Sequence, residues 1–269
     1  MRHSNSLQPR FLLKLFSYTL PFILSFGLTL SITKTLQAAN SATNAPAELK
    51  NLISQLETAA NQRNHKQVME FYSPKFTNSD GLTYNTVSQS LTKFWEQYNQ
   101  VKYTTTIDSW EKKGDQLIAT TTTTIQGTGK FKGRPMTLNS TIKSRQQFQG
   151  NKLIYQEVLS ERNEITSGQN PPKVEIRIPD QVKVGQDFDF DVILAEPLGD
   201  SLLAGAAIDE KVESDRYLDP KTLDLELLPG GGIFKRAKAP ITPENRWLSA
   251  ILIRGDGMVL ITQRIKVEK

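Results

Sequence analysis

The chain has 269 residues, a formal net charge of +5, no cysteine and two histidines, His3 and His65. The absence of cysteine excludes a disulfide framework, thiolate catalysis and zinc sites of the cysteine kind. Two histidines cannot form a His-rich metal site, so we expect neither a metal nor a cofactor. Four of the basic residues lie within residues 1–39, which leaves the rest of the chain nearly neutral. A nucleic-acid partner is therefore not expected.

Residues 1–39 have the layout of a secretory signal. A basic flank precedes an uncharged apolar run from Leu15 to Ile32, and small residues follow at Ala38 and Ala39. The apolar run is about as long as the shortest segments that span a bilayer. The segment is thus predicted to be either a cleaved signal peptide or an uncleaved N-terminal membrane anchor. Both alternatives predict export, to the periplasm or to a membrane-anchored position facing the periplasm or lumen.

Three helices are predicted next. Leu49, Leu52, Ile53 and Leu56 recur at helical spacing and indicate the first helix. A short second helix begins after Asn64, which can cap it with Gln67 three residues on, and it ends at Ser73-Pro74. The third helix is expected from Thr86 to Tyr98, with one apolar stripe made by Val87, Leu91, Phe94, Trp95 and Tyr98.

The periodicity then changes from 3.6 to 2 residues. Alternating segments at 101–110, 116–128, 136–148 and 153–165, separated by turn residues, predict a four-stranded antiparallel meander. Helices followed by a meander indicate an α+β fold, in which the sheet must curve over the helices to bury both apolar faces.

This order of elements resembles the NTF2-like (SnoaL-like) superfamily over residues 46–166. The phrase Val68-Met69-x-Phe71-Tyr72-Ser73-x-x-Phe76 in the second helix adds to the resemblance. The superfamily includes isomerases, cyclases, dehydratases and binding modules without chemistry, so the resemblance implies a cone-shaped fold and a pocket, and no particular activity. A homodimer through the NTF2-like sheet is a further expectation.

Residues 167–172 are small and polar with two prolines, as in a linker. The remainder, residues 173–269, is predicted to be all strand. Strands are expected at 174–178, 188–194, 202–212, 222–228, 245–254 and 257–267. Short strands with Gly and Pro turns are typical of an immunoglobulin-like (Ig-like) β-sandwich. The phrase PDQVKVGQDFDFDVIL resembles the opening strands of bacterial envelope Ig-like domains.

Face alternation predicts which side chains point into the cone. The residues expected to line it are Leu56, Met69, Tyr72, Trp95, Tyr103, Ile107, Leu138, Ile142 and Tyr155. The leading hypothesis is a non-catalytic envelope module whose cone holds a small apolar or amphipathic ligand or an envelope protein. A structural role, with the cone filled by its own side chains, is an alternative.

Carboxylates are the remaining candidates for catalysis, because His65 lies in a polar stretch that predicts an exposed side chain. Alternation places Asp108 on the outer face of its strand, paired with a lysine. Glu157 and Glu161 share a predicted face with Leu153 and are better placed to reach a pocket. The alternative function is a cofactor-free isomerase or cyclase that uses Glu157 or Asp108 as its base with a tyrosine partner.

Overall fold

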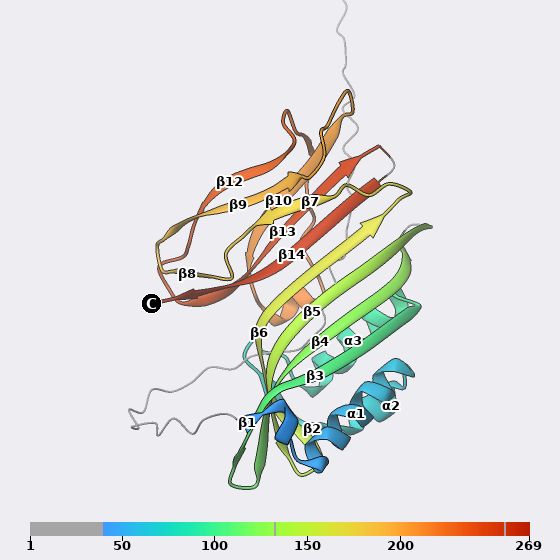
Figure 1. Cartoon of the computed structure of the whole chain (residues 1–269), viewed down its shortest axis with the longest axis vertical. Helices are drawn as coiled ribbons and strands as arrows, with labels where there is room; N and C mark the ends of the chain where they lie inside the picture. The colour runs from blue at the N-terminus through green and yellow to red at the C-terminus, as the bar shows by residue number, and fades with distance from the viewer. Residues whose placement is uncertain (1–39, 132, 256) are drawn as a thin grey trace, which may run out of the picture.

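The computed structural model describes residues 40–131, 133–255 and 257–269. The signal peptide or anchor predicted for residues 1–39 lies outside these ranges. Within the described residues, no helix is long and apolar enough to cross a membrane. One 11-stranded sheet extends through the N-terminal and C-terminal halves of the chain (Figure 1).

The three helices are α1 (Ala47–Asn61), α2 (His65–Glu70) and α3 (Tyr84–Gln97). Asn64 caps α2 as predicted, since its Oδ1 accepts a hydrogen bond from the Gln67 backbone N–H at 3.1 Å. α3 begins two residues before its predicted start because Thr83 forms a capping box with Thr86. The apolar stripe of α3 is buried against the sheet, as its periodicity predicted.

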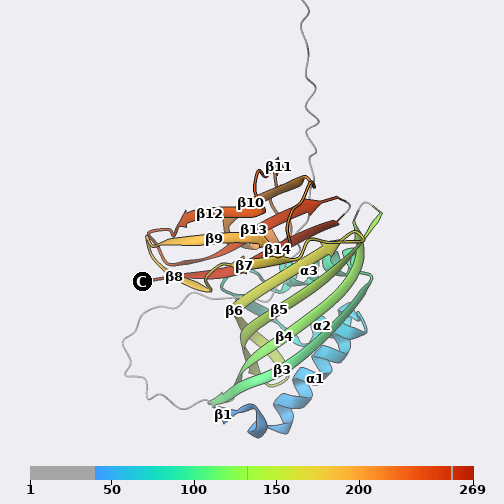
Figure 2. The ribbon, with the colours of Figure 1, turned by 45° about the horizontal axis from the view of Figure 1, so that its top comes forward.

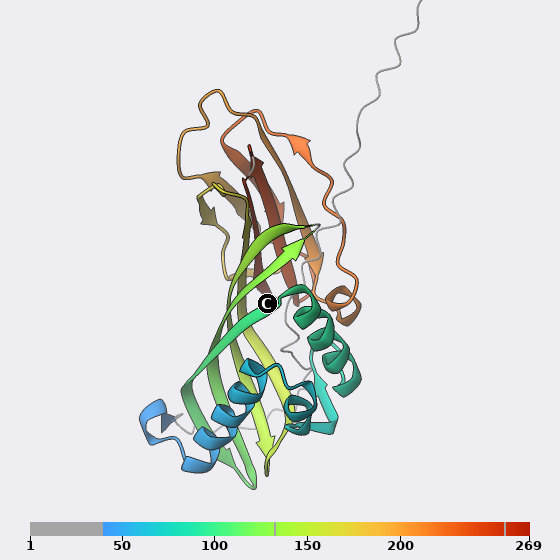
Figure 3. The ribbon, with the colours of Figure 1, turned by 90° about the vertical axis from the view of Figure 1, so that its right-hand side faces the viewer.

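The predicted meander is present as β3 (Gln100–Lys113), β4 (Gln116–Phe131), β5 (Arg134–Gln149) and β6 (Lys152–Ser167), and the helices cover one of its faces (Figure 3). Two short strands were not predicted, β1 (Asn40–Ser41) and β2 (Tyr72–Asn78). β1 pairs with β3, and β2 runs parallel to β6 with an irregular register between Tyr72 and Thr77. Pro74 and the irregular register break the period-2 alternation, so the sequence pattern does not reveal β2.

The C-terminal half contains eight strands among the described residues: β7 (Val174–Arg177), β8 (Gln181–Lys183), β9 (Asp187–Leu194), β10 (Leu203–Lys211), β11 (Glu226–Leu227), β12 (Gly232–Lys238), β13 (Glu244–Arg254) and β14 (Gly257–Glu268). The strand predicted at 222–228 is reduced to the two residues of β11, and β8 and β12 were not predicted. A short helical turn, η2 (Ser214–Tyr217), lies between β10 and β11.

β12, β9 and β7 form a separate three-stranded sheet that lies over one face of β10, β13 and β14 (Figure 2). Phe190 and Val192 of β9 share a buried core with Leu248, Leu252 and Ile261 of the main sheet. The C-terminal half is therefore built from two packed layers of strands, as expected for a sandwich.

Strands of the N-terminal and C-terminal halves belong to one sheet, and the halves meet where β6 lies beside β14. β6 pairs antiparallel with β14, from Arg162 opposite Gln263 to Ser167 opposite Met258. On the helix side of this seam, a single hydrophobic core includes residues from both halves, among them Ile165 and Leu260. β14 is buried on both faces along most of its length, in agreement with the continuous apolar run at residues 258–261.

Candidate functional site

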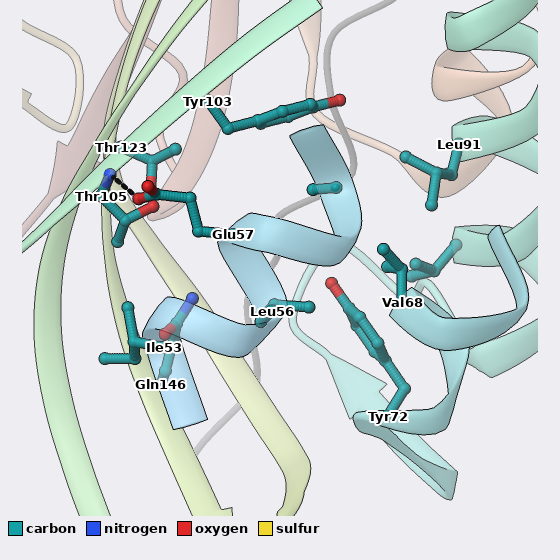
Figure 4. A pocket seen from close by; sticks show the side chains of 12 residues that line it. Ile53, Leu56, Glu57, Val68, Tyr72, Leu91, Tyr103, Thr105, Thr123 and Gln146 are labelled. Carbon is teal, nitrogen blue, oxygen red and sulfur yellow. Dashed lines mark hydrogen bonds between the residues drawn. The ribbon is translucent and has the colours of Figure 1, made fainter. Parts of the chain in front are cut away.

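A cavity of about 50 Å³ lies between the three helices and the inner face of the sheet (Figure 4). Aliphatic side chains from all three helices form most of its wall: Ile53, Leu56, Ala60, Val68, Val87 and Leu91. Tyr72 and Tyr103 lie at two ends of this space, and each has its ring against the aliphatic side chains. The cavity is thus the unfilled part of the predicted cone.

One side of the cavity is polar and is made by Glu57, Thr105, Thr123 and Gln146. The Glu57 Oε2 accepts a hydrogen bond from the Thr105 backbone N–H at 2.6 Å, and the hydroxyls of Thr105 and Thr123 lie 3.1 Å apart. Among the described residues, no basic group comes within 4.0 Å of the Glu57 carboxylate. A carboxylate without a cationic partner therefore lies at the edge of an apolar space, where its other oxygen can accept a further donor.

The position of Glu57 follows from the way α1 covers the edge of β3. Asn61 lies one turn after Glu57, on the same face of the helix. Its Nδ2 donates to the Tyr103 carbonyl at 3.0 Å, and its Oδ1 accepts from the Tyr103 N–H at 2.7 Å. Asn61 and Glu57 thus take the hydrogen bonds that a neighbouring strand would otherwise supply to β3.

The two cavity tyrosines are held in the neutral form. Burial raises the pKa of both Tyr72 and Tyr103 above the ordinary tyrosine value, although a hydrogen bond from Trp95 acts in the opposite direction on Tyr103. The Trp95 Nε1–H donates to the Tyr103 hydroxyl oxygen at 2.9 Å, so the proton of that hydroxyl stays available to another acceptor.

Three of the nine residues predicted to line the cone do so: Leu56, Tyr72 and Tyr103. Four others lie in the surrounding core without reaching the cavity wall: Met69, Trp95, Leu138 and Ile142. Ile107 is partly buried against this core. In the β5–β6 register, Tyr155 is opposite Gln147. Gln147 follows Gln146, whose side chain lines the cavity, so Gln147 and Tyr155 both point to the other face of the sheet. Its predicted place in the cavity was wrong.

Asp108 lies on the outer face of β3, as predicted, and its Oδ2 accepts from the Thr122 hydroxyl at 2.8 Å and lies 3.4 Å from the Lys143 ammonium. Glu157 pairs with Arg145 in the sheet register, which also places it on the outer face. Neither carboxylate reaches the cavity. Neither is therefore placed to act as a base on a ligand in this cavity.

Glu161 is buried, but not in the cavity. A bulge between Val158 and Ser160 inserts Leu159 as an extra residue and reverses the alternation of β6. Leu159 consequently is 41% exposed, whereas Glu161 is 3% exposed. Its Oε2 accepts from the Trp247 indole N–H at 3.0 Å and lies 3.3 Å from Arg264, within a buried charged cluster between the two halves.

Glu57, Thr123 and Gln146 were not predicted as site residues. The signal for Glu57 is present in the sequence, because Glu57 and Asn61 are polar residues one turn apart beside the apolar positions Ile53, Leu56 and Ala60. Thr121 and Thr123 are buried on the inner face of β4. His65 is partly buried, and its Nε2 lies 2.9 Å from the Ser88 hydroxyl, which ties α2 to α3. No cluster among the described residues has three or more acidic or histidine side chains placed to hold a metal ion.

Comparisons with known proteins give one family model and several solved structures. Residues 169–268 match the family model described as Domain of unknown function (DUF8623), and no curated protein matches the chain. Bd1075 of Bdellovibrio bacteriovorus aligns with 16% identity and a TM-score of 0.31 over 41% of this chain and 38% of its own.

Two smaller solved proteins align over most of their length. A protein with a ketosteroid isomerase-like fold from Catenulispora acidiphila, in complex with trimethylamine, has 13% identity and a TM-score of 0.28 over 40% of this chain and 82% of its own. An NTF2-like protein of unknown function from Cytophaga hutchinsonii has 11% identity and a TM-score of 0.25 over 43% and 91%. The chain is thus similar over about two fifths of its length to proteins of NTF2-like and ketosteroid isomerase-like fold, and over residues 169–268 to a domain of unknown function.

Proposed function

We propose that the chain is an exported binding module without catalytic activity, whose cavity holds a small amphipathic ligand. The observation that carries this proposal is the asymmetry of the cavity wall. Glu57 and its polar neighbours form one side, and six aliphatic side chains together with Tyr72 and Tyr103 form the rest. A molecule with a hydrogen-bond donor at one end and a short alkyl body matches both sides.

The size of the cavity limits the ligand. A water molecule needs roughly 10–15 Å³ of such space, so about 50 Å³ has room for only a few non-hydrogen atoms. The unpaired Glu57 carboxylate favours a cationic donor over a neutral one, because charge-assisted hydrogen bonds are stronger. A small alkylammonium ion has the required size, a short alkyl body for the aliphatic wall and a cationic donor for Glu57. The faces of Tyr72 and Tyr103 add to its binding by cation–π attraction.

Isothermal titration calorimetry with propylammonium, 1-propanol and butyrate tests this assignment. Propylammonium is expected to bind most tightly, and butyrate is expected not to bind because Glu57 repels it. Glu57→Gln should reduce propylammonium affinity about tenfold, since it removes the charge from the hydrogen bond. Asp108→Asn is the matched control, because Asp108 lies on the outer face. Equal affinity for all three probes, or an unchanged Glu57→Gln variant, would contradict the proposal.

The domain assignments and the location are part of the same proposal. We infer an NTF2-like domain at residues 46–166, supported by the three helices and the meander, and an Ig-like domain at residues 173–269, supported by the two packed layers. The cell-envelope location is supported by the sequence of residues 1–39 alone. The intact mass of protein from the host envelope fraction tests it, since a cleaved chain begins near Ala39 and an anchored one keeps the leader.

A further inference from the structure

The wall of the cavity contains two buried polar side chains without a hydrogen-bond partner. Tyr72 is 3% exposed and Gln146 is 4% exposed, and both line the cavity. The Tyr72 ring packs edge-on against Phe76, with 5.0 Å between the ring centroids. Within the part of the chain that the structure describes, however, neither the Tyr72 hydroxyl nor the Gln146 side-chain amide forms a hydrogen bond.

The other polar side chains of the wall each have at least one hydrogen bond. The Tyr103 oxygen accepts from Trp95, the hydroxyls of Thr105 and Thr123 lie 3.1 Å apart, and Glu57 accepts from a backbone N–H. Buried polar groups in folded proteins nearly always have a partner, because one left without a partner lowers stability. A bound ligand can supply the partners that the first two side chains lack.

These two side chains come from different elements. Gln146 lies on the inner face of β5, and Figure 4 shows it on the same side of the cavity as Glu57. Tyr72 is the first residue of β2, and its hydroxyl points from the other side toward α1 (Figure 4). A ligand that satisfies both side chains therefore needs a polar group at each of its ends.

The group that meets Tyr72 should be neutral. Burial raises the pKa of the Tyr72 hydroxyl, which therefore keeps its proton at pH 7 and can donate it in a hydrogen bond. None of the described residues that line the cavity is a lysine, an arginine or a histidine. A ligand carboxylate beside Tyr72 would thus be buried without a cation, which is costly. A ligand hydroxyl accepts from Tyr72 and carries no charge.

The group on the other side should be a cation with several donors. An ammonium group has three N–H bonds, so it can donate to the Glu57 carboxylate and to the Gln146 Oε1 together. A neutral hydroxyl has one O–H and can satisfy only one of these two acceptors. The ammonium end of the ligand therefore belongs at Glu57 and Gln146, and the hydroxyl end belongs at Tyr72.

We propose that the ligand of this cavity is a small amino alcohol, an assignment that rests on the binding function proposed above. Its ammonium group donates to Glu57 and Gln146, and its hydroxyl accepts from the Tyr72 hydroxyl. 2-Aminoethanol has the same number of non-hydrogen atoms as propylammonium, with a hydroxyl in place of the terminal methyl group. It therefore fits the same space of about 50 Å³.

Isothermal titration calorimetry of the full-length chain at pH 7 compares 2-aminoethanol, propylammonium and glycine. 2-Aminoethanol should bind about tenfold more tightly than propylammonium, because only its hydroxyl gives Tyr72 a partner. Glycine, which carries a carboxylate at that end, should not bind detectably. If propylammonium binds as tightly as 2-aminoethanol or more tightly, the amino alcohol is wrong and the binding function stands. If neither binds, both proposals are wrong.

Tyr72→Phe should reverse the preference, so that propylammonium binds more tightly than 2-aminoethanol. The substitution removes the hydroxyl and keeps the ring that packs against Phe76. Tyr98→Phe is the matched control, because the Tyr98 hydroxyl is also buried without a partner among the described residues but lies outside the cavity wall. An unchanged preference in Tyr72→Phe, or the same change in Tyr98→Phe, would overturn the assignment.

The stability of Tyr72→Phe without ligand separates a binding role from a structural one. The hydroxyl has no partner within the described chain, so its removal should leave the variant at least as stable as the wild type in urea denaturation. Added 2-aminoethanol should stabilise the wild type more than the variant. A marked loss of stability in the unliganded variant would show that the hydroxyl bonds within the protein, and the proposal would fail.

Gln146→Leu tests the ammonium end. It should weaken 2-aminoethanol and propylammonium by a similar factor, because both ligands carry the ammonium group that Gln146 accepts from. The preference for 2-aminoethanol should remain. A loss confined to 2-aminoethanol would place the hydroxyl at Gln146 and would overturn its assignment to Tyr72.

Discussion

Arg264 and Asp80 form a bidentate ion pair across the seam between the two halves, although they are 184 residues apart in the chain. The Arg264 Nη1 donates to the Asp80 Oδ1 at 3.2 Å, and the Nη2 donates to the Oδ2 at 2.8 Å. Both side chains are 2% exposed. Glu161 lies on the other side of the guanidinium, and the Tyr217 hydroxyl donates to Asp80 at 2.5 Å. A cation of the C-terminal half is thus neutralised by carboxylates of the N-terminal half.

Arg264→Met should destabilise the protein by about 3–5 kcal/mol, because it leaves two carboxylates buried without their cation. Urea denaturation measures the change in the free energy of unfolding. The matched control is Asp108→Asn, which removes the half-exposed pair with Lys143 and should change stability by less than about 1 kcal/mol. Similar effects of the two substitutions would show that the buried cluster does not hold the halves together.

Stability should fall at alkaline pH, in part because of Tyr217. Burial raises the pKa of the Tyr217 hydroxyl well above its ordinary value of about 10, and the Asp80 carboxylate raises it further. The stabilising effect of this group is complete below pH 10, where the unfolded state also keeps the proton. Above pH 10 the unfolded tyrosine ionises and the folded one does not, so unfolding becomes more favourable.

The Tyr217→Phe variant isolates this effect. Between pH 10 and 11, wild-type stability should fall by about 1 kcal/mol more than that of the variant, because the unfolded tyrosine goes from half to about nine-tenths ionised in this range. Urea denaturation at several pH values gives both slopes. Parallel slopes would mean that Tyr217 ionises in the folded protein. The absolute stability of the variant does not enter the comparison, so the loss of the hydrogen bond to Asp80 does not disturb it.

The sequence predicted the elements that have a strong local pattern. α3 was predictable because Val87, Leu91 and Phe94 repeat at helical spacing on a helix with one buried face. The meander was predictable because turn residues separate four long alternating runs. The register inside those strands was not predictable, since bulges after Ile107 and Val158 shift the alternation and send Leu159 outward.

Contacts between distant segments account for most of the rest. The pairing of β6 with β14 and the cluster of Asp80, Glu161 and Arg264 depend on how two halves of the chain meet, which no local pattern records. Part of the cavity also depends on a contact between segments that are distant in the chain. Tyr72 and Tyr103 were found by face parity, whereas Glu57 is placed by the contact between α1 and the edge of β3.

Asn61→Ala should destabilise the protein by about 1–2 kcal/mol, because it removes two hydrogen bonds to the Tyr103 backbone and leaves that N–H and C=O without partners. Gln55→Ala, at an exposed position of the same helix, is the control and should have little effect. Thermal denaturation of both variants measures the difference. A Gln55→Ala effect as large as that of Asn61→Ala would contradict a special role for the Asn61 amide.

Gly129→Ala should destabilise the protein by about 1–3 kcal/mol. A Cβ at Gly129 would lie 2.2 Å from the Gln97 carbonyl oxygen, so β4 and the end of α3 would have to separate. Gly230→Ala is the matched control, since a Cβ there has no neighbour within 4 Å. Urea denaturation should show almost no change for the control. An equally small change at Gly129 would mean that the contact between α3 and β4 yields easily.

Ala60→Val should block ligand binding while it leaves the fold intact. Ala60 lies in the aliphatic wall of the cavity, and two added methyl groups would fill much of a space of about 50 Å³. The gain from filling a cavity offsets the lower helix propensity of valine, so stability should stay within about 1 kcal/mol of the wild type. Propylammonium affinity should fall at least about tenfold, as measured by calorimetry. Thr58→Val, on the exposed side of the same helix, should bind as the wild type does. Unchanged binding by Ala60→Val would place the ligand outside this cavity and would leave Glu57 with a purely structural role at the edge of β3.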